Sequence, residues 1–252
     1  MSLVLVTGAT GEVGRSVLPW LEERFSLRLI SLYPAGNDPR RVQADILDWN
    51  AVSATMRGVE TVLHLAVASG HSGVYEEDAF NDQRFDVNVK GTYHVFEAAR
   101  RAKVRRVVHV SSLMVVWGYG KEGPVPGDAS PKPIGTYALT KTLTEEIARH
   151  YAERHNIEVI TLRITKPLDI NDPEQLRRPV RPQQVPAPDL AQAFIRALTV
   201  PLERYEIVTI VGESSRRVWD LGPARRVLGY EPQYRLDNYV VNWADPFAVE
   251  RE

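Results

Sequence analysis

The stretch TGATGEVG, residues 7–14, follows a short apolar run at residues 3–6 and precedes an amphipathic segment. Glycines at this spacing have separate tasks. The first permits a tight turn, the second lets the backbone approach a pyrophosphate, and the third lets the helix pack against the strand. The N-terminus of that helix offers amide donors and a positive potential to phosphate groups. Placed between a strand and a helix, the motif predicts a dinucleotide site rather than a simple turn.

A second motif, YALTK at residues 137–141, places a phenol and an ammonium on one face of an expected helix, because residues four apart are neighbours there. A free tyrosine has a pKa of ~10, and a nearby ammonium favours its phenolate, so Tyr137 can act in proton transfer near neutral pH. Ser112, at the end of an expected strand, can stabilise charge on a substrate oxygen. Ser112, Tyr137 and Lys141 are therefore the candidate catalytic residues for hydride transfer between a substrate carbon and a nicotinamide.

Around these motifs, short β-like runs alternate with longer amphipathic stretches, which is typical of a parallel sheet covered by helices. The expected strands are 3–6, 27–32, 41–44, 61–65, 106–110, 158–163 and 205–211. The expected helices include residues 12–24, 52–56, 82–101, 135–154, 189–198 and 221–228. Residues 169–188 carry five prolines and are expected to be a loop. The pattern predicts an α/β fold, a Rossmann-type doubly wound parallel sheet (residues 1–166) with a small C-terminal substrate-binding lobe (residues 167–252) interleaved with it.

The composition excludes several classes of function. A formal net charge of −1 gives no electrostatic reason to expect a nucleic acid or an anionic membrane as partner. The absence of cysteine removes disulfides and thiolate chemistry, and the six histidines lack metal-ligand spacing. No stretch approaches the ~20 apolar residues of a membrane span, and the apolar start is too short for a signal peptide. We expect a cytoplasmic enzyme that acts on a small molecule and holds no metal.

The motifs together resemble the extended short-chain dehydrogenases/reductases of the NAD-dependent epimerase/dehydratase group. The matching residues run in the order of that family: TGATGEVG at 7–14, Asp45-Ile46, His64-Leu65-Ala66, NVKGT at 88–92, Ser111-Ser112, the Tyr137/Lys141 pair and Leu162-Arg163. The resemblance implies that Asp45 meets the adenine, that Leu65 and Ala66 line the nicotinamide ribose, and that the helix carrying Asn88 supports the sheet. The expected cofactor-binding residues are Gly8, Thr10, Gly11, Glu12, Val13, Gly14, Ser31, Asp45, Ile46, Leu65, Ala66, Val67, Asn88, Val110, Tyr137, Lys141 and Ile164.

The choice between NAD and NADP depends on the end of the second strand. An acid there would bind the ribose 2′-hydroxyl of NAD and repel the additional phosphate of NADP. The sequence has LISLY at residues 29–33 and no acid before Asp38. Arg15, Arg40 and Arg41 are candidates for contact with a 2′-phosphate, and each is equally well explained as a surface arginine. The sequence favours NADP, with NAD as the alternative.

The substrate is expected to be small. Only residues 142–252 follow the catalytic pair, whereas family members that hold a nucleotide sugar usually have a larger C-terminal lobe. The chain resembles short uronate dehydrogenases in length and in the motifs LYP, GxYxxxK and LGYEP. This resemblance places substrate contacts at Ser69, Ser112, Leu113, Lys166 and Arg178. Two positions depart from those enzymes: their SSNH reads SSLM at residues 111–114, and Ser31 replaces the second-strand acid. We expect a sugar-like or hydroxylated substrate, with uronic acids among the candidates.

Two other functions remain open from the sequence. One is a sugar or nucleotide-sugar epimerase or dehydratase, which would recycle a tightly bound cofactor. The other is a non-enzymatic NADP-sensing regulator, although such proteins typically lose the Tyr/Lys pair that is intact here.

A homodimer is also expected. The helices at 82–101 and 135–154 are associated with more apolar residues than one buried face requires: Phe80, Val87, Tyr93, Val95, Leu139, Leu143, Ile147 and Tyr151. In the family that the chain resembles, these two helices form an intermolecular four-helix bundle.

Overall fold

Seven parallel strands form a central sheet in the computed structural model, which describes residues 2–33, 36–69, 76–120, 124–176, 184–215 and 218–236. These strands are β1 (Leu3–Thr7), β2 (Ser26–Ser31), β3 (Arg41–Gln43), β4 (Thr61–His64), β5 (Arg106–Ser112), β6 (Glu158–Ile164) and β9 (Tyr205–Ile210). Their order across the sheet is β3-β2-β1-β4-β5-β6-β9. The chain therefore adds strands outward in one direction from β1 to β3 and in the opposite direction from β4 to β9, and this reversal lies between β1 and β4. Doubly wound sheets bind ligands outside the carboxyl ends of their strands at such a reversal. The predicted fold class is confirmed.

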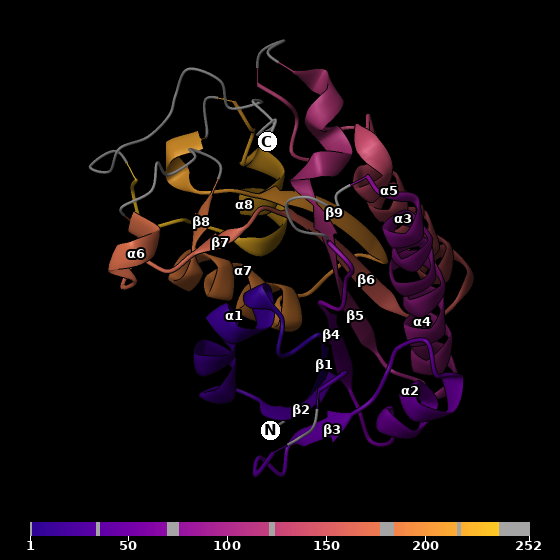
Figure 1. The fold of residues 1–252 in the computed structure, drawn as a ribbon. Helices are drawn as coiled ribbons and strands as arrows, with labels where there is room; N and C mark the ends of the chain where they lie inside the picture. Colours follow the sequence, from indigo (N-terminus) through magenta and orange to yellow (C-terminus); the bar gives the residue numbers. More distant parts are fainter. Residues whose placement is uncertain are drawn as a thin grey trace.

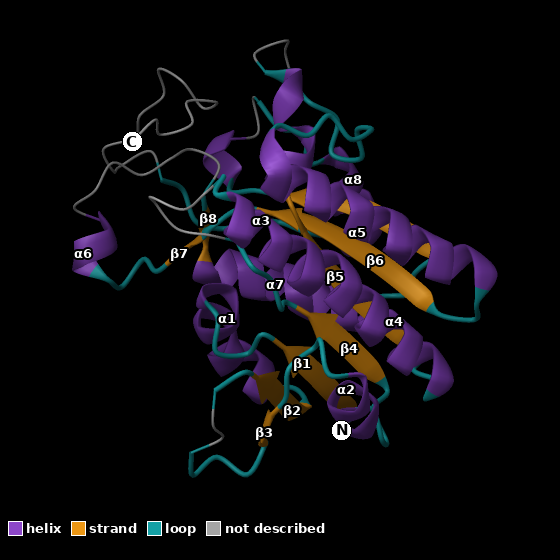
Figure 2. Ribbon diagram, turned by 45° about the vertical axis from the view of Figure 1, so that its right-hand side comes forward, coloured by secondary structure: helices purple, strands orange, loops and turns teal. Residues whose placement is uncertain are grey.

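Helices cover both faces of the sheet (Figures 1 and 2). One layer contains α1 (Glu12–Glu22), α7 (Ala187–Thr199) and α8 (Gly222–Leu228), which share a hydrophobic core with the strands. The other layer contains α2 (Trp49–Thr55), α4 (Gly91–Arg101) and α5 (Gly135–Arg154), which pack over a second core.

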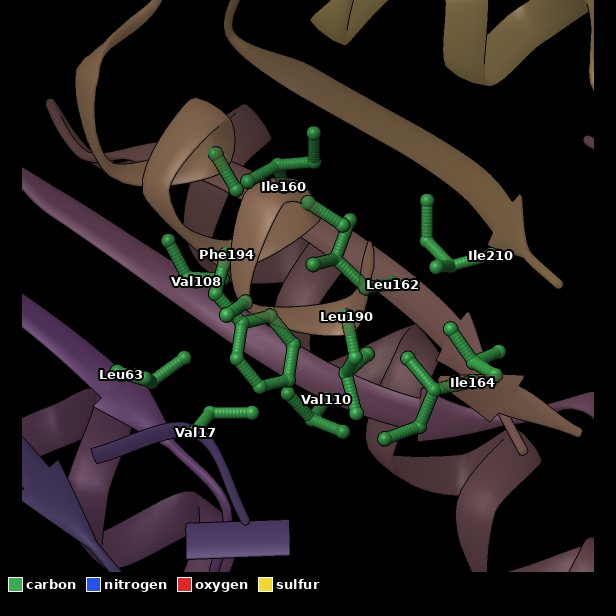
Figure 3. Close-up of a cluster of buried hydrophobic side chains, with 14 of the residues drawn as sticks. Val17, Leu63, Val108, Val110, Ile160, Leu162, Ile164, Leu190, Phe194 and Ile210 are labelled. Carbon is green, nitrogen blue, oxygen red and sulfur yellow. The ribbon is translucent and has the colours of Figure 1, made fainter. Parts of the chain in front are cut away.

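Alternation along the strands explains the two cores. Val4 and Val6 of β1 belong to the first core and Leu5 to the second, because successive side chains of a strand point to opposite faces. The central strands β1 and β4 are buried on both faces and are therefore rich in apolar residues. Figure 3 shows the first core, where Phe194 of α7 lies close to Val110 of β5. This packing holds the carboxyl ends of the strands in fixed positions.

The long helix expected at 82–101 begins earlier than predicted and is not uniform. It consists of α3 (Asp78–Arg84), a π-helical segment (Phe85–Lys90) and α4, with helical backbone angles at both junctions. A π-helical turn inserts an extra residue and often occurs at functional sites. Here it carries Asn88.

The chain after residue 166 contributes both to the main sheet with its helix layers and to a separate two-stranded pair. The elements α7, β9 and α8 extend the main layers, whereas β7 (Pro167–Leu168) and β8 (Val185–Pro186) pair separately. Near them lies the short helix α6 (Pro173–Leu176), so the stretch 169–188, expected to be a loop, contains regular structure. The remaining described helices are 3-10 segments at Leu113–Tyr119 and Glu213–Ser215. The division of the chain at residue 166 stays a prediction.

Candidate active site

The glycine turn connects β1 to α1 at the reversal point of the sheet. Gly8 has a φ of +67°, and a Cβ there would lie 2.7 Å from the Cα of Ala66, so only glycine fits. A Cβ on Gly14 would lie 2.7 Å from the carbonyl carbon of Ala9, so this glycine permits close packing of α1. A Cβ on Gly11 would meet only the carbonyl oxygen of Gly8, at 3.1 Å. Gly8 and Gly14 are therefore needed by the fold, whereas Gly11 leaves space beside the turn.

The start of α1 fits a pyrophosphate. Gly11 is the N-cap residue and has no side chain with which to bind the amides of the first turn. Amides at such a helix start are donors for an anion, and the helix dipole favours negative charge there. The cofactor cradle predicted for residues 8–14 is thus compatible with the diphosphate of NAD or NADP.

The end of β4 forms the opposite wall of this turn. Thr7 Oγ1 accepts the amide hydrogens of Leu65 and Ala66, both at 3.1 Å. With both lone pairs used, the Thr7 hydroxyl donates to His64 Nδ1 at 2.7 Å, which leaves His64 Nε2–H to donate to Thr92 Oγ1 at 2.9 Å. Burial lowers the pKa of His64 to about 3, so the imidazole is neutral. Sequence patterns do not indicate this network, which fixes Leu65 and Ala66 against Gly8.

Asn88 supports the segment after β4. Its side chain accepts from the amide of Ala68 at 2.8 Å and donates to the carbonyl of Ala68 at 3.3 Å and to Thr140 Oγ1 at 3.0 Å. The residue is buried, and these bonds join the segment to α5. Val67 and Ser69 on this segment are exposed. Asn88 is therefore placed to position the cofactor wall from behind.

The catalytic candidates meet where β5 ends beside α5. Ser112 is the last residue of β5, and its Oγ accepts the amide hydrogen of Met114 at 3.2 Å. Lys141 is buried, and its Nζ donates to the carbonyl oxygen of Val110 at 2.6 Å. Tyr137 lies one helical turn earlier and is half-buried. Burial lowers the pKa of Lys141 to about 8, and the charge of Glu145 partly opposes this effect.

Two expected contact residues face inward instead. Leu113 is 1% exposed and packs in the first hydrophobic core, because the 3-10 segment turns its side chain away from the surface. Ile46 is 5% exposed and contacts Gly91 at the start of α4. Their side chains belong to the core, and only their backbones remain near the carboxyl edge of the sheet. Ile164, at the end of β6, is 6% exposed and pairs in register with Ser112.

The adenine end of the expected site is polar. Ser31 ends β2 and donates from Oγ to the carbonyl of Tyr33 at 3.2 Å. Asp45 Oδ1 accepts the amide hydrogen of Leu47 at 2.8 Å in the turn after β3.

The arginines considered for a 2′-phosphate already have partners. Arg40 donates to Asp38 at 2.8 and 2.9 Å and pairs with Glu22 at 3.2 Å, while Arg41 lies 3.6 Å from Asp38. The Arg40 guanidinium lowers the pKa of Asp38 to about 2. Arg15 donates to the carbonyl oxygen of Thr10 at 2.5 Å. Contact with a 2′-phosphate would require Arg40 and Arg41 to leave Asp38.

Of the expected substrate cations, Lys166 is described and Arg178 lies outside the described residues. Lys166 Nζ is 3.0 Å from Glu12 Oε1, and both side chains are more than half exposed. The pair links the segment after β6 to the first residue of α1. It is a surface ion pair, so its contribution to stability is small.

Three further features complete the description. No cluster of metal-ligating side chains occurs in the part of the chain that the structure describes. Among the described helices, none is both long and apolar enough to cross a membrane. A groove between α1 and α7, lined by residues including Trp20, Arg24, Gln192 and Arg196, lies on the helix layer and is separate from the glycine turn and the catalytic candidates.

Comparisons with known proteins agree with this geometry. The NAD-dependent glucose-6-phosphate dehydrogenase of Haloferax volcanii is 28% identical over 91% of this chain and 92% of its own length. The L-arabinose 1-dehydrogenase (NAD(P)(+)) of the same organism is 28% identical over 92% of this chain and 97% of its own length. The crystal structure of uronate dehydrogenase from Agrobacterium tumefaciens is 27% identical, with a TM-score of 0.76, over 93% of this chain and 85% of that chain. The model of the NAD dependent epimerase/dehydratase family matches residues 4–175. The chain belongs to this family.

Proposed function

We propose that this protein is an NAD(P)-dependent dehydrogenase that transfers a hydride between the nicotinamide and a small sugar-like substrate. The observation that carries the proposal is the buried Lys141 one turn after Tyr137, beside the end of β5 where Ser112 lies. The similar proteins named above support the reaction class, because each is named as a dehydrogenase of a sugar or a sugar acid.

The reaction divides among three side chains. When bound, the nicotinamide supplies the hydride acceptor or donor. In the oxidative direction, Tyr137 takes the proton of the substrate hydroxyl as the carbonyl forms. Lys141 stabilises the phenolate and binds the nicotinamide ribose, while the Ser112 hydroxyl binds the reacting oxygen and stabilises its charge.

A substrate screen tests the proposal. Aldoses, uronic acids, sugar phosphates, other polyols and hydroxy acids are offered with each cofactor, and reduced nicotinamide is followed by its absorbance. Net formation of reduced cofactor with one of these classes supports a dehydrogenase. Tightly bound cofactor that survives purification, together with turnover that produces no net reduced cofactor, would instead support an epimerase or dehydratase.

We further propose that NADP is bound more tightly than NAD. No acid ends β2 to repel the 2′-phosphate, and the exposed Arg15 lies in the first turn of α1, beside the glycine turn. The expected result is a lower dissociation constant for NADP in calorimetry. Arg15→Ala should weaken the binding of NADP and leave that of NAD unchanged, because only NADP carries the 2′-phosphate. A clear preference for NAD would contradict this proposal, and one similar protein is named for NAD alone.

We also propose a homodimer through α4 and α5. Of the residues expected at this interface, Tyr93, Leu139 and Leu143 are exposed, whereas Val95 and Tyr151 are buried in the protein's own core. Leu143→Glu should shift the protein to a monomer in light scattering, because it places a charge within an apolar contact. Val42→Glu, at an exposed apolar residue of the edge strand β3, is the matched control. A monomeric wild-type protein at micromolar concentration would contradict the proposal.

The cytoplasmic location stays a prediction.

A further inference from the structure

Glu145 continues the row that contains Tyr137 and Lys141 on α5, each residue four positions after the last. The carboxylate is 3% exposed and is held by two neighbouring strands. Ser111 Oγ donates to Glu145 Oε1 at 2.6 Å, and Arg163 donates from Nε to Oε1 at 2.9 Å and from Nη2 to Oε2 at 2.7 Å. Ser111 and Arg163 are register partners on β5 and β6, so both donors reach the carboxylate from one level of the sheet.

These contacts join α5 to the catalytic end of β5. The last three residues of β5 each have a separate partner. The Val110 carbonyl accepts from Lys141, the Ser111 hydroxyl donates to Glu145, and Ser112 lies at the expected substrate position. A bidentate arginine–carboxylate pair is geometrically specific. The arrangement therefore sets the position of α5 along and around its axis relative to Ser112.

The titratable groups around Lys141 are either neutral or paired, apart from the effect of Glu145. His64 of β4 and His109 of β5 are buried and neutral, because burial lowers the pKa of each imidazole. On β6, the guanidinium of Arg163 is paired with Glu145. On α5, Tyr137 precedes Lys141 by one turn, and Glu145 is the group whose charge opposes the effect of burial on Lys141. Removing the Glu145 charge would leave the Lys141 ammonium without this compensation.

We propose that Glu145 is a positioning residue whose carboxylate, fixed by Arg163 and Ser111, holds Tyr137 and Lys141 of α5 beside Ser112 and acts electrostatically on Lys141. The inference rests on the proposed function only in giving Lys141 a catalytic task. The ionisation of Lys141 can be measured without any substrate or cofactor. A carboxylate that acts on Lys141 should change this ionisation when its charge is removed, whereas a carboxylate without electrostatic contact with Lys141 should not.

Substituting each partner of the Glu145–Arg163 pair in turn tests whether the pair acts electrostatically on Lys141. Glu145→Gln removes the negative charge and should lower the pKa of Lys141, whereas Arg163→Gln removes the positive charge and should raise it. A shift of about one pH unit is the expected order for a charge on the neighbouring turn of the same helix. The measurement is an NMR titration of protein labelled at the lysine Cε. The sequence has six lysines, and the resonance missing from Lys141→Met assigns the one of interest.

The control is Glu146→Gln, the adjacent but exposed residue of the same helix, which pairs with Arg149 and should leave the titration unchanged. If a single variant does not fold, the double variant Glu145→Gln/Arg163→Met removes both charges and leaves neither buried alone. It should lower the pKa of Lys141 by less than Glu145→Gln would, because the glutamate lies on the same helical face as Lys141.

Opposite shifts in the two single variants, or a lowered value in the double variant, support the proposal. An unchanged Lys141 titration, or shifts of the same sign in both single variants, would overturn it. Once a substrate is known, the pH profile of turnover should move in the same directions. Correct Lys141 shifts without turnover on any substrate would refute the proposed reaction while leaving the electrostatic role of Glu145 intact.

Discussion

Tyr137→Phe is expected to lower turnover by ~10²–10⁴-fold, the contribution of a positioned general acid or base. The change removes one hydroxyl from a half-buried ring at the start of α5 and keeps the ring itself. Cofactor affinity should change little, because Lys141 and the glycine turn remain. The measurement compares kcat with the affinity for NAD and NADP in the same preparation.

The matched control is Tyr205→Phe, because Tyr205 is a half-buried tyrosine at the first residue of β9, at the opposite edge of the sheet from the carboxyl ends of the strands. It should retain full turnover. An equal loss in both variants would point to a general effect on stability. Full activity of Tyr137→Phe on an identified substrate would refute the mechanism, and the Tyr/Lys pair would then have only a structural role.

The parts of the site that the sequence predicts are local in the chain. The glycine turn and the Tyr137/Lys141 pair each lie within eight residues, and their spacing alone determines which groups meet on a turn or a helix face. The parallel sheet follows from the alternation of apolar runs with helical stretches, because parallel strands need long crossovers that are usually helical. The structure has the turn, the helix and the parallel sheet where the sequence predicts them, and the roles of the site residues stay predictions.

The parts that were missed depend on tertiary contacts. The Glu145–Arg163 pair joins a helix to a strand whose register is set by the whole sheet. The inward orientation of Leu113 depends on a 3-10 segment that apolar periodicity does not indicate. The helical stretch expected at 52–56 lies at the end of α2, whose start is marked by Asp48, a recognisable N-cap that accepts from the amides of Asn50 and Ala51. The capping signal would have found this helix start, whereas the ion pair had no signal beyond the four-residue spacing of Glu145 from Lys141.

Gly11→Val is expected to weaken nucleotide binding by at least about a hundredfold, equivalent to about 2.7 kcal/mol. The valine side chain would occupy the space beside the uncapped start of α1, where the pyrophosphate must approach the amides. The fold should tolerate the change, because Gly11 has a φ of −68° and its Cβ would meet only the carbonyl of Gly8. Binding is measured by calorimetry, and thermal unfolding without nucleotide measures the fold.

Comparison with Gly8→Ala makes this test specific. Gly8 has a left-handed backbone, and its Cβ would overlap the backbone of Ala66, so Gly8→Ala should lower the unfolding temperature together with binding. Gly11→Val should separate the two quantities, because only the approach of the ligand is blocked. Undiminished affinity in Gly11→Val would place the pyrophosphate elsewhere. Equal loss of stability in both variants would show that Gly11 serves the turn and not the cofactor. Binding lost at an unchanged unfolding temperature is the result that assigns residues 8–14 to the nucleotide.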